Sequence, residues 1–267
     1  MRGLLLINPR AGTERPTTEE LAGAAQALGI EVHVLDKGDD AAELAREAQA
    51  DALGAAGGDG SVATVAAVAV ERDLPLVVVP LGTWNHFARD LGLDRDDPIA
   101  ALQGFEGRER RIDVGRAGGR RFLNNVSLGA YAALVHRRER RRRRSEALAG
   151  LRALWISLRE RSGVWARVNG EPLSGRVLLV ANNAYELNLF SIGERARLDE
   201  GRLYLYTANG LLPRAWEERS GEGFELDAPG GRLEAAVDGE PVVLETPLEL
   251  AIEPRALRVL LPRAPGG

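Results

Sequence analysis

The chain has 267 residues, of which 45% are hydrophobic and 28% charged, and its formal net charge is −4. This length allows one large or two ordinary domains with a substantial core. Because there is no cysteine and only three histidines, the composition excludes disulfides, thiolate metal sites and cysteine nucleophiles and disfavours a histidine-rich metal centre. The N-terminal apolar run ends at Asn8-Pro9, too soon for a secretory signal, so we expect a cytoplasmic protein.

The first part of the chain alternates between strand-like and helix-like segments. Thr17 and Glu20 have the spacing of a capping box, and Gly29 is suited to the end of the helix that they begin. Strands are expected at residues 3–7, 31–35, 51–56 and 75–79, and helices at 17–28, 41–49, 62–71 and 86–91. Strands and helices that alternate in this way indicate a Rossmann-like α/β domain with a parallel sheet.

After about residue 113, the pattern changes to short strand-like segments separated by Gly, Pro or Asn. These segments are residues 121–126, 164–168, 176–181, 202–206, 224–227, 232–237 and 248–252. Their spacing predicts an antiparallel β-sandwich, interrupted by a helical insert at about residues 131–161. We therefore expect an α/β domain at residues 1–115 and a β-sandwich domain at residues 116–246.

Three turn-rich loops follow strands of the first domain, so they should lie at the carboxyl edge of its sheet, where ligands bind in such folds. The loops are Asn8-Pro9-Arg10-Ala11-Gly12, Gly57-Gly58-Asp59-Gly60-Ser61 and Gly82-Thr83-Trp84-Asn85. Glycines let the backbone approach a phosphate, and a helix N-terminus adds partial positive charge. Together the loops predict a nucleotide phosphate site. The alternative is ordinary turns in which Asp59, Thr83 or Asn85 caps the next helix.

In order and spacing, these motifs resemble the diacylglycerol kinase catalytic family, in the bacterial lipid kinase branch related to sphingosine kinases and NAD kinases. The resemblance rests on the first two loops, on Pro80-Leu81-Gly82-Thr83-Trp84-Asn85-His86-Phe87-Ala88-Arg89, on Asp238-Gly239-Glu240, and on segments 124–129 and 181–186. It covers nearly the whole chain. It implies an ATP-binding first domain, a β-sandwich that carries the lipid, and a C-terminal segment, residues 247–262, that packs back on the first domain.

The resemblance implies a lipid kinase that uses ATP and Mg²⁺. The residues implied for the ATP site are Asn8, Pro9, Arg10, Ala11, Gly12, Gly57, Gly58, Asp59, Gly60, Ser61, Val62, Ala63, Gly82, Thr83 and Asn85. Glu240 is expected to accept the proton of the lipid hydroxyl, with Asp238 as its partner and Asp59 directed at Mg²⁺–ATP. By itself, Asp238-Gly239 between strand-like runs predicts a type I′ hairpin turn, and the two interpretations are compatible.

Several residues depart from the family pattern, and the departures at Thr64, His86 and Glu200 keep other functions open, whereas Ser61 keeps the hydroxyl. Ser61 replaces the more usual Thr, Thr64 stands where many relatives have Glu, and His86 occupies a position that is often Asp. A half-buried structural role is the alternative for His86. The rival functions are a non-catalytic lipid- or nucleotide-binding protein and a kinase for another alcohol, such as a sphingoid base or NAD.

Some bacterial members of the family carry a structural Mg²⁺ at an Asp-Gly turn in the second domain. The matching segment here is residues 197–202, in which Glu200 replaces the Asp. The backbone carbonyls of Arg197 and Arg202 would complete the site. The longer reach of Glu200 changes the geometry that Mg²⁺ demands.

A basic segment, Arg137 to Arg144, contains seven arginines and one glutamate. Such a segment can dock on an anionic membrane surface, which suits a kinase whose lipid stays in the bilayer and would place the protein at the inner face of the cytoplasmic membrane. The alternative is a solvated helix in which Glu139 and Glu146 pair with the arginines. No nucleic-acid partner is expected, because no other basic face supports one. Sandwich edges that remain open could pair in a homodimer.

Overall fold

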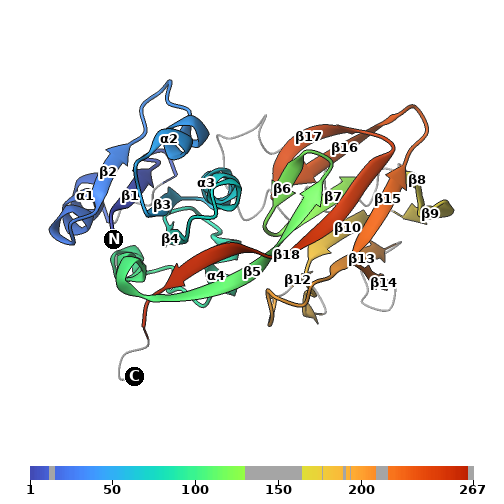
Figure 1. The fold of residues 1–267 in the computed structure, drawn as a ribbon. Coiled ribbons are helices and arrows are strands. Elements are labelled where there is room, and N and C mark those ends of the chain that lie inside the picture. Colours follow the sequence, from blue (N-terminus) through green and yellow to red (C-terminus); the bar gives the residue numbers. More distant parts are fainter. Residues whose placement is uncertain are drawn as a thin grey trace. The chain divides into compact units, whose positions relative to one another are not determined.

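The computed structural model describes residues 1–11, 16–129, 164–175, 177–188, 191–192, 194–208 and 216–263 (Figure 1). The chain divides into two compact units, Met1–Asp113 with Arg255–Gly267, and Val114–Pro254. The helical insert expected at residues 131–161, with its arginine-rich segment, lies outside the described residues, as does Gly12. In the part of the chain that is described, no helix has both the length and the apolar character needed to cross a membrane.

A parallel sheet organises the first unit. Its strands are β1 (Gly3–Ile7), β2 (Glu31–Val34), β3 (Ala52–Gly57), β4 (Leu76–Pro80) and the end of β18 (Leu248–Leu261), in the order β2-β1-β3-β4-β18. The C-terminal segment joins this sheet through Val259, which pairs in parallel with Leu76. The parallel α/β architecture predicted for this region is confirmed.

The helices of the first unit begin and end at local signals. They are α1 (Thr18–Ala27), α2 (Ala41–Glu47), α3 (Asp59–Glu71), α4 (His86–Asp90) and α5 (Pro98–Ala101), followed by the 3₁₀ helix η1 (Leu102–Glu106). The capping box of Thr17 and Glu20 starts α1 as predicted. Leu21 and Ala25 of α1 belong to one buried cluster with Leu5 of β1. Helix packing of this kind stabilises the sheet through apolar burial.

Helix α3 starts three residues before the predicted position. Its first turn uses Asp59, Gly60 and Ser61, which the sequence pattern assigns to a loop, and Gly58 is its N-cap. The turn fits because Gly57 has no side chain: a Cβ atom there would lie 2.7 Å from the Cβ of Ser61. Close packing against β3 therefore decides the start of the helix, although glycine disfavours helix in isolation.

The second unit contains two antiparallel layers. The six-stranded sheet consists of β7 (Asn125–Gly129), β10 (Val177–Asn182), β13 (Leu203–Ala208), β14 (Trp216–Gly221), β16 (Arg232–Val237) and β17 (Glu240–Glu245), in the order β14-β13-β10-β7-β16-β17. The other layer joins the first half of β18 to β15 (Gly223–Asp227), β8 (Val164–Val168) and β9 (Glu171–Gly175). β5 (Arg108–Ala117) and β6 (Arg120–Phe122) form a hairpin that pairs with β18. A short pair, β11 (Leu187–Asn188) and β12 (Ser191–Ile192), lies outside both layers.

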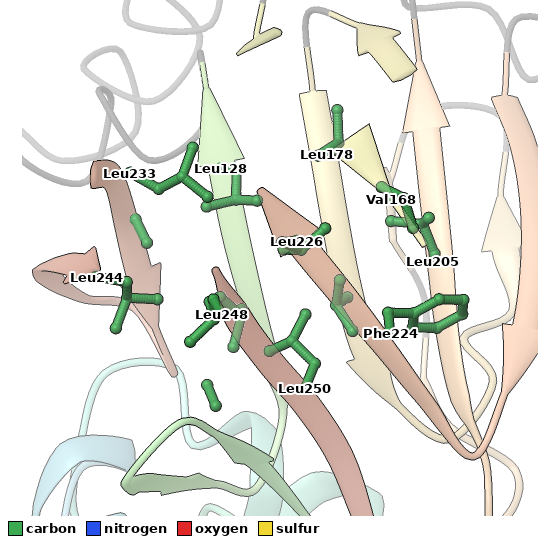
Figure 2. Packing of buried hydrophobic residues seen from close by; sticks show 14 of the residues in the cluster. Leu128, Val168, Leu178, Leu205, Phe224, Leu226, Leu233, Leu244, Leu248 and Leu250 are labelled. Carbon is green, nitrogen blue, oxygen red and sulfur yellow. The ribbon is translucent and has the colours of Figure 1, made fainter. Parts of the chain in front are cut away.

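The core of the second unit lies between these layers. Figure 2 shows Leu128, Leu205 and Leu233 of the six-stranded sheet beside Phe224 and Leu250 of the other layer. All five side chains are buried, which is the arrangement of a β-sandwich. The predicted antiparallel sandwich is thereby confirmed.

The strand predicted at residues 121–126 is wrong as a single element. β6 ends at Phe122 and β7 begins at Asn125, with a bend at Leu123 and Asn124. The backbone N–H groups of the bend are bonded to the carboxylate of Asp238 instead of to a neighbouring strand. The sequence pattern missed the bend because its cause is a side chain more than 100 residues away.

Candidate functional site

The loops after β1, β3 and β4 meet at the carboxyl edge of the parallel sheet. The side-chain amide of Asn8 donates to the Oγ of Ser61 across 2.8 Å, which ties the first loop to the first turn of α3. The second and third loops are in closer contact, since a Cβ atom added to Gly82 would lie 2.5 Å from the Cα of Gly58. The structure therefore brings together three of the predicted loops, and glycine is needed where two of them touch.

The N-terminus of α3 lies at this junction. Its N-cap residue is Gly58, so no capping side chain accepts from the first turn of the helix. Backbone N–H groups at a helix N-terminus, reinforced by the helix dipole, form a site for an anionic phosphate group. Val62 is buried in the core and can offer a ligand only its backbone, whereas Ser61 and Ala63 are half-buried. The arrangement fits a phosphate held by main-chain groups.

Asp59 caps α4, whereas the alternative interpretation made it the cap of the helix that directly follows it, α3. Its carboxylate accepts from the backbone N–H groups of His86, at 3.2 Å, and Phe87, at 3.1 Å. Asp59 thus caps α4 while its own backbone begins α3. The prediction that Asp59 is the N-cap of its own helix is wrong, because Gly58 occupies that position. Through Asp59, the second loop is fixed to the third.

Asn85 stabilises the third loop rather than capping α4. Its backbone is left-handed, with φ of 45°, and its side chain accepts from the N–H of Gly82 and donates to the carbonyl of Gly82. These bonds close the loop on itself and hold Gly82 against Gly58. Thr83 is exposed beside them. The capping alternative for Asn85 is therefore wrong, since its side chain makes no cap hydrogen bond.

His86 and Trp84 form an aromatic stack next to these loops. Their rings are 6.0 Å apart and inclined by 6°, and 51% of Trp84 is exposed. His86 is also exposed, so the half-buried structural role considered for it is not what the structure shows. Partial desolvation of the imidazole lowers the pKa of His86, and the charge of Asp59 works against this. The imidazole of His86 therefore takes up a proton less readily than an ordinary histidine.

The first loop is held by its own hydrogen bonds. Asn8 accepts from the N–H of Arg10 with its side chain and from the N–H of Ala11 with its carbonyl. Pro9 and Arg10 are exposed beyond this turn. Asn8 therefore both shapes its loop and joins it to Ser61.

Asp238 and Gly239 form the turn between β16 and β17. Both have positive φ, at 48° and 84°, and Val237 pairs with Glu240 across the turn. These are the features of the type I′ hairpin predicted from the Asp-Gly pair, so the hairpin interpretation is confirmed. Glu240 is the first residue of β17 and is exposed.

The carboxylate of Asp238 is bound by backbone groups, in contrast to that of Glu240. It accepts from the N–H groups of Leu123 at 2.7 Å, Asn124 at 2.7 Å and Asn125 at 3.1 Å. Burial raises the pKa of Asp238 to about 6, while these donors and the Arg195 guanidinium act in the opposite direction. The two acidic side chains of Asp238-Gly239-Glu240 thus have different environments, one anchored in the protein and one in contact with solvent.

Arg195 belongs to the same polar cluster, although no sequence motif marks it as a site residue. Its guanidinium donates to the carbonyl of Leu123 at 2.6 Å, to the carbonyl of Asn182 at 2.9 Å and to the Oδ1 of Asn124 at 2.7 Å. Arg195 is one of many arginines in the chain, and its neighbours in sequence show no distinguishing pattern. Among the arginines that the structure describes, its burial, at 3% exposure, sets it apart.

Comparison with known proteins agrees with the motifs. Residues 2–117 match the family model of the diacylglycerol kinase catalytic domain. The resemblance to this family is confirmed, because relatives named probable lipid kinase YegS-like and diacylglycerol kinase also match the chain.

The relatives extend the similarity beyond the matched domain. The chain is 26% identical to a protein named probable lipid kinase YegS-like from Klebsiella pneumoniae (strain 342), over 97% of this chain and 95% of the relative. It is 31% identical to a diacylglycerol kinase from Bacillus subtilis (strain 168), over 51% of this chain and 48% of the relative. A crystal structure of a diacylglycerol kinase from Bacillus anthracis str. Sterne covers 97% of this chain and 96% of its own, with a TM-score of 0.71 and 16% identity. That structural likeness shows the shared two-domain fold.

The segment at which the resemblance predicts a structural Mg²⁺, residues 197–202, is closed by hydrogen bonds. The Oε2 of Glu200 accepts from the N–H of Ala184, and the carbonyl of Arg202 accepts from the N–H of Asn183. The Oδ1 of Asn183 in turn accepts from the N–H of Glu200. Among the described residues, no group of three or more His, Asp or Glu side chains could hold a metal ion. The metal site formed by Arg197, Glu200 and Arg202 stays a prediction.

Proposed function

We propose that this chain is an ATP-dependent lipid kinase that transfers a phosphoryl group to a lipid hydroxyl, such as that of diacylglycerol. The observation that carries the proposal is the convergence of three loops on the N-terminus of α3, in a domain of the diacylglycerol kinase catalytic family. The names of the relatives, probable lipid kinase YegS-like and diacylglycerol kinase, support the same activity.

The first unit would bind the nucleotide. Backbone N–H groups at the start of α3 would hold a phosphate, and the contact of Gly82 with Gly58 leaves main chain, not side chains, at the surface of the loops. Mg²⁺, when bound, neutralises charge on the transferred phosphate. Asp59 is the residue that we propose faces the metal. Each of its oxygens accepts one backbone N–H, and a carboxylate keeps further lone pairs for a cation.

The second unit would supply the base. Glu240 is an exposed carboxylate fixed by the backbone of a tight turn, and it can accept the proton of an approaching hydroxyl. Asp238 would act as its partner by anchoring the turn, because its own oxygens are bonded to three backbone N–H groups. We assign the proton transfer to Glu240 alone.

A lipid kinase must reach a substrate that stays in the bilayer. We propose that the arginine-rich segment, Arg137 to Arg144, contacts an anionic membrane surface and holds the protein at the cytoplasmic face. Each basic residue near such a surface contributes about 1 kcal/mol. Pairing of open sandwich edges in a homodimer remains a further prediction.

Phosphorylation of a lipid extract with radiolabelled ATP and Mg²⁺ tests the function, and the labelled product identifies the lipid. We expect Glu240→Gln to lower lipid-dependent kcat by about 10²- to 10⁴-fold, the range that general bases contribute. Glu245→Gln is the matched control, since Glu245 is exposed at the other end of β17. Full activity of the Glu240→Gln variant would show that the base is assigned wrongly.

A non-catalytic lipid- or nucleotide-binding protein is the second candidate. It is favoured by the engagement of both Asp59 oxygens with the α4 backbone and by the His86 ring at a position that is often Asp. The same extract decides between the two candidates when direct lipid binding is measured alongside turnover. Tight binding without phosphorylation of any lipid, a sphingoid base or NAD would select the non-catalytic role.

A further inference from the structure

Arg195 is a buried cation whose hydrogen bonds converge on one short segment. Among its bonds to described residues, two go to the bend between β6 and β7, at the Leu123 carbonyl and the Asn124 side chain. Its guanidinium also lies 5.5 Å from the centre of the Tyr185 ring. Burial of a guanidinium, which stays charged, is costly unless its donors are satisfied, so this geometry fixes the segment around it.

Asp238 holds the same bend through the backbone N–H groups of the bend. That carboxylate accepts the N–H groups of Leu123, Asn124 and Asn125, while Arg195 and the side chain of Asn182 donate to the Leu123 carbonyl. Residues 123–125 thus lie between two charged groups. The Asp238 carboxylate accepts their N–H groups, and the Arg195 guanidinium donates to the Leu123 carbonyl and the Asn124 side-chain oxygen. We refer to Arg195, Asp238 and residues 123–125 as the polar clamp.

The polar clamp is connected to Glu240 through the backbone of the hairpin turn. Asp238 lies in the hairpin turn in a left-handed conformation, and Glu240 starts β17 two residues later. The N–H of Asp238 donates to the Asn125 carbonyl, so the backbone and the side chain of this residue both hold the turn to the clamped segment. A shift of residues 123–125 would therefore move the turn and the carboxylate that follows it.

We infer that Arg195 is a positioning residue for Glu240, which it acts on through residues 123–125 and the Asp238 carboxylate. The inference rests on the proposed role of Glu240 as base. Arg195 itself is buried, so it acts on the hydroxyl only through this chain of contacts. Displacement of a reacting group by about 1 Å can cost about 10²-fold in rate, which makes such a contact visible in kcat.

A purely structural role for Arg195 gives a different result. In that case, loss of Arg195 would lower stability and reduce activity only as far as it reduces the folded fraction. A positioning role lowers kcat of the folded enzyme while the KM for ATP, set by the first unit, changes little. Leu226→Ala is the matched control. Leu226 is fully buried on β15 of the second unit, and its strand partners are Leu248 and Val168, which are not residues of the clamp.

The test compares the full-length wild type with Arg195→Met, Arg195→Lys, Asn124→Ala and Leu226→Ala, at a temperature at which each is folded. We expect kcat for lipid phosphorylation to fall about 10- to 100-fold in Arg195→Met and less in Arg195→Lys, with the KM for ATP within about threefold. Asn124→Ala removes one acceptor of the guanidinium and should lower kcat severalfold, which keeps the test valid if Arg195→Met does not fold. Leu226→Ala should lower the unfolding midpoint but leave kcat within about twofold.

Hydrogen exchange provides a readout that does not depend on activity. Amides of residues 123–125 and 238–240 should exchange faster in the Arg195 variants than in Leu226→Ala at the same distance from the unfolding midpoint. Unchanged exchange in these segments, or wild-type kcat in folded Arg195→Met, would overturn the positioning role. If exchange accelerates as expected while Glu240→Gln retains full activity, Arg195 does hold these segments in place, and the assignment of Glu240 as the base is wrong.

Discussion

The loops of the first unit and the polar clamp of the second unit are built in opposite ways. The loops rely on missing side chains, since Gly58 and Gly82 let two backbone segments touch and leave main-chain groups for a ligand. The clamp relies on two charged side chains, half-buried Asp238 and buried Arg195, whose bonds reach segments far away in sequence. A phosphate needs a surface of backbone donors, whereas a base needs one carboxylate held at a fixed place.

This difference explains how each region responds to substitution. A side chain added to the loops should interfere with binding and leave the rest of the unit folded. A side chain removed from the clamp should leave unsatisfied polar groups inside the protein, which lowers stability. The following predictions test that contrast, from the largest expected effect to the smallest.

Asp238→Ala should cause the largest loss of stability. Three backbone N–H groups, of Leu123, Asn124 and Asn125, would lose their acceptor, and each unsatisfied buried group costs about 1–3 kcal/mol. Because water can reach some of them, we expect the free energy of unfolding to fall by about 2–4 kcal/mol in a urea titration. Glu240→Gln, two residues away and exposed, should change it by less than about 0.5 kcal/mol. Equal midpoints for the two variants would contradict the anchoring role.

Gly82→Ala should weaken nucleotide binding with a smaller effect on stability. The new Cβ would lie 2.5 Å from the Cα of Gly58, so the second and third loops must separate. We expect the KM or Kd for ATP to rise by about 10- to 100-fold, in line with the cost of an error of about 1 Å. The measurement is a calorimetric or kinetic titration with Mg²⁺–ATP.

Gly23→Ala is the matched control for Gly82→Ala. Gly23 lies within α1, and a Cβ atom there would meet nothing within 4 Å. Alanine is favoured over glycine within a helix by about 0.5–1 kcal/mol, so this variant should be slightly more stable and bind ATP normally. A similar loss of ATP binding in both variants would show that the contact of Gly82 with Gly58 does not matter.

The pH dependence of stability should reveal Asp238 separately. Burial raises the pKa of Asp238 to about 6 from its ordinary value of 3.8, so between these values the folded state holds a proton that the unfolded state has released. Its contribution to stability is complete below pH 3.8 and is lost as the pH rises through 6. Relative to Asp238→Asn, the wild type should therefore lose stability between pH 4 and pH 7, by at most about 1.4 kcal/mol per pH unit. Parallel pH profiles would refute this titration.

The alternation of strands and helices in the first unit and the positions of its three loops could be predicted from the sequence. The capping box at Thr17, the strand periodicity of the first unit and the Asp238-Gly239 turn depend on residues close together in the chain, so local rules describe them. The start of α3 was missed because packing of Ser61 on Gly57 outweighs the low helix propensity of glycine. The break in the strand at Leu123 was missed because no local residue causes it.

The sequence by itself determined the α/β and sandwich patterns and the positions of the three loops, and it supplied the residues that we propose for phosphoryl transfer. The tertiary structure decided what those residues bind. It assigned Asp59 to the cap of α4, separated anchored Asp238 from exposed Glu240, and buried Arg195 against Leu123 and Asn124, whose N–H groups Asp238 accepts. The physical reason is distance along the chain. Backbone conformation follows mostly from neighbouring residues, whereas the hydrogen-bond partners of a charged side chain are brought to it by folding, and those of Asp238 lie 113–115 residues away.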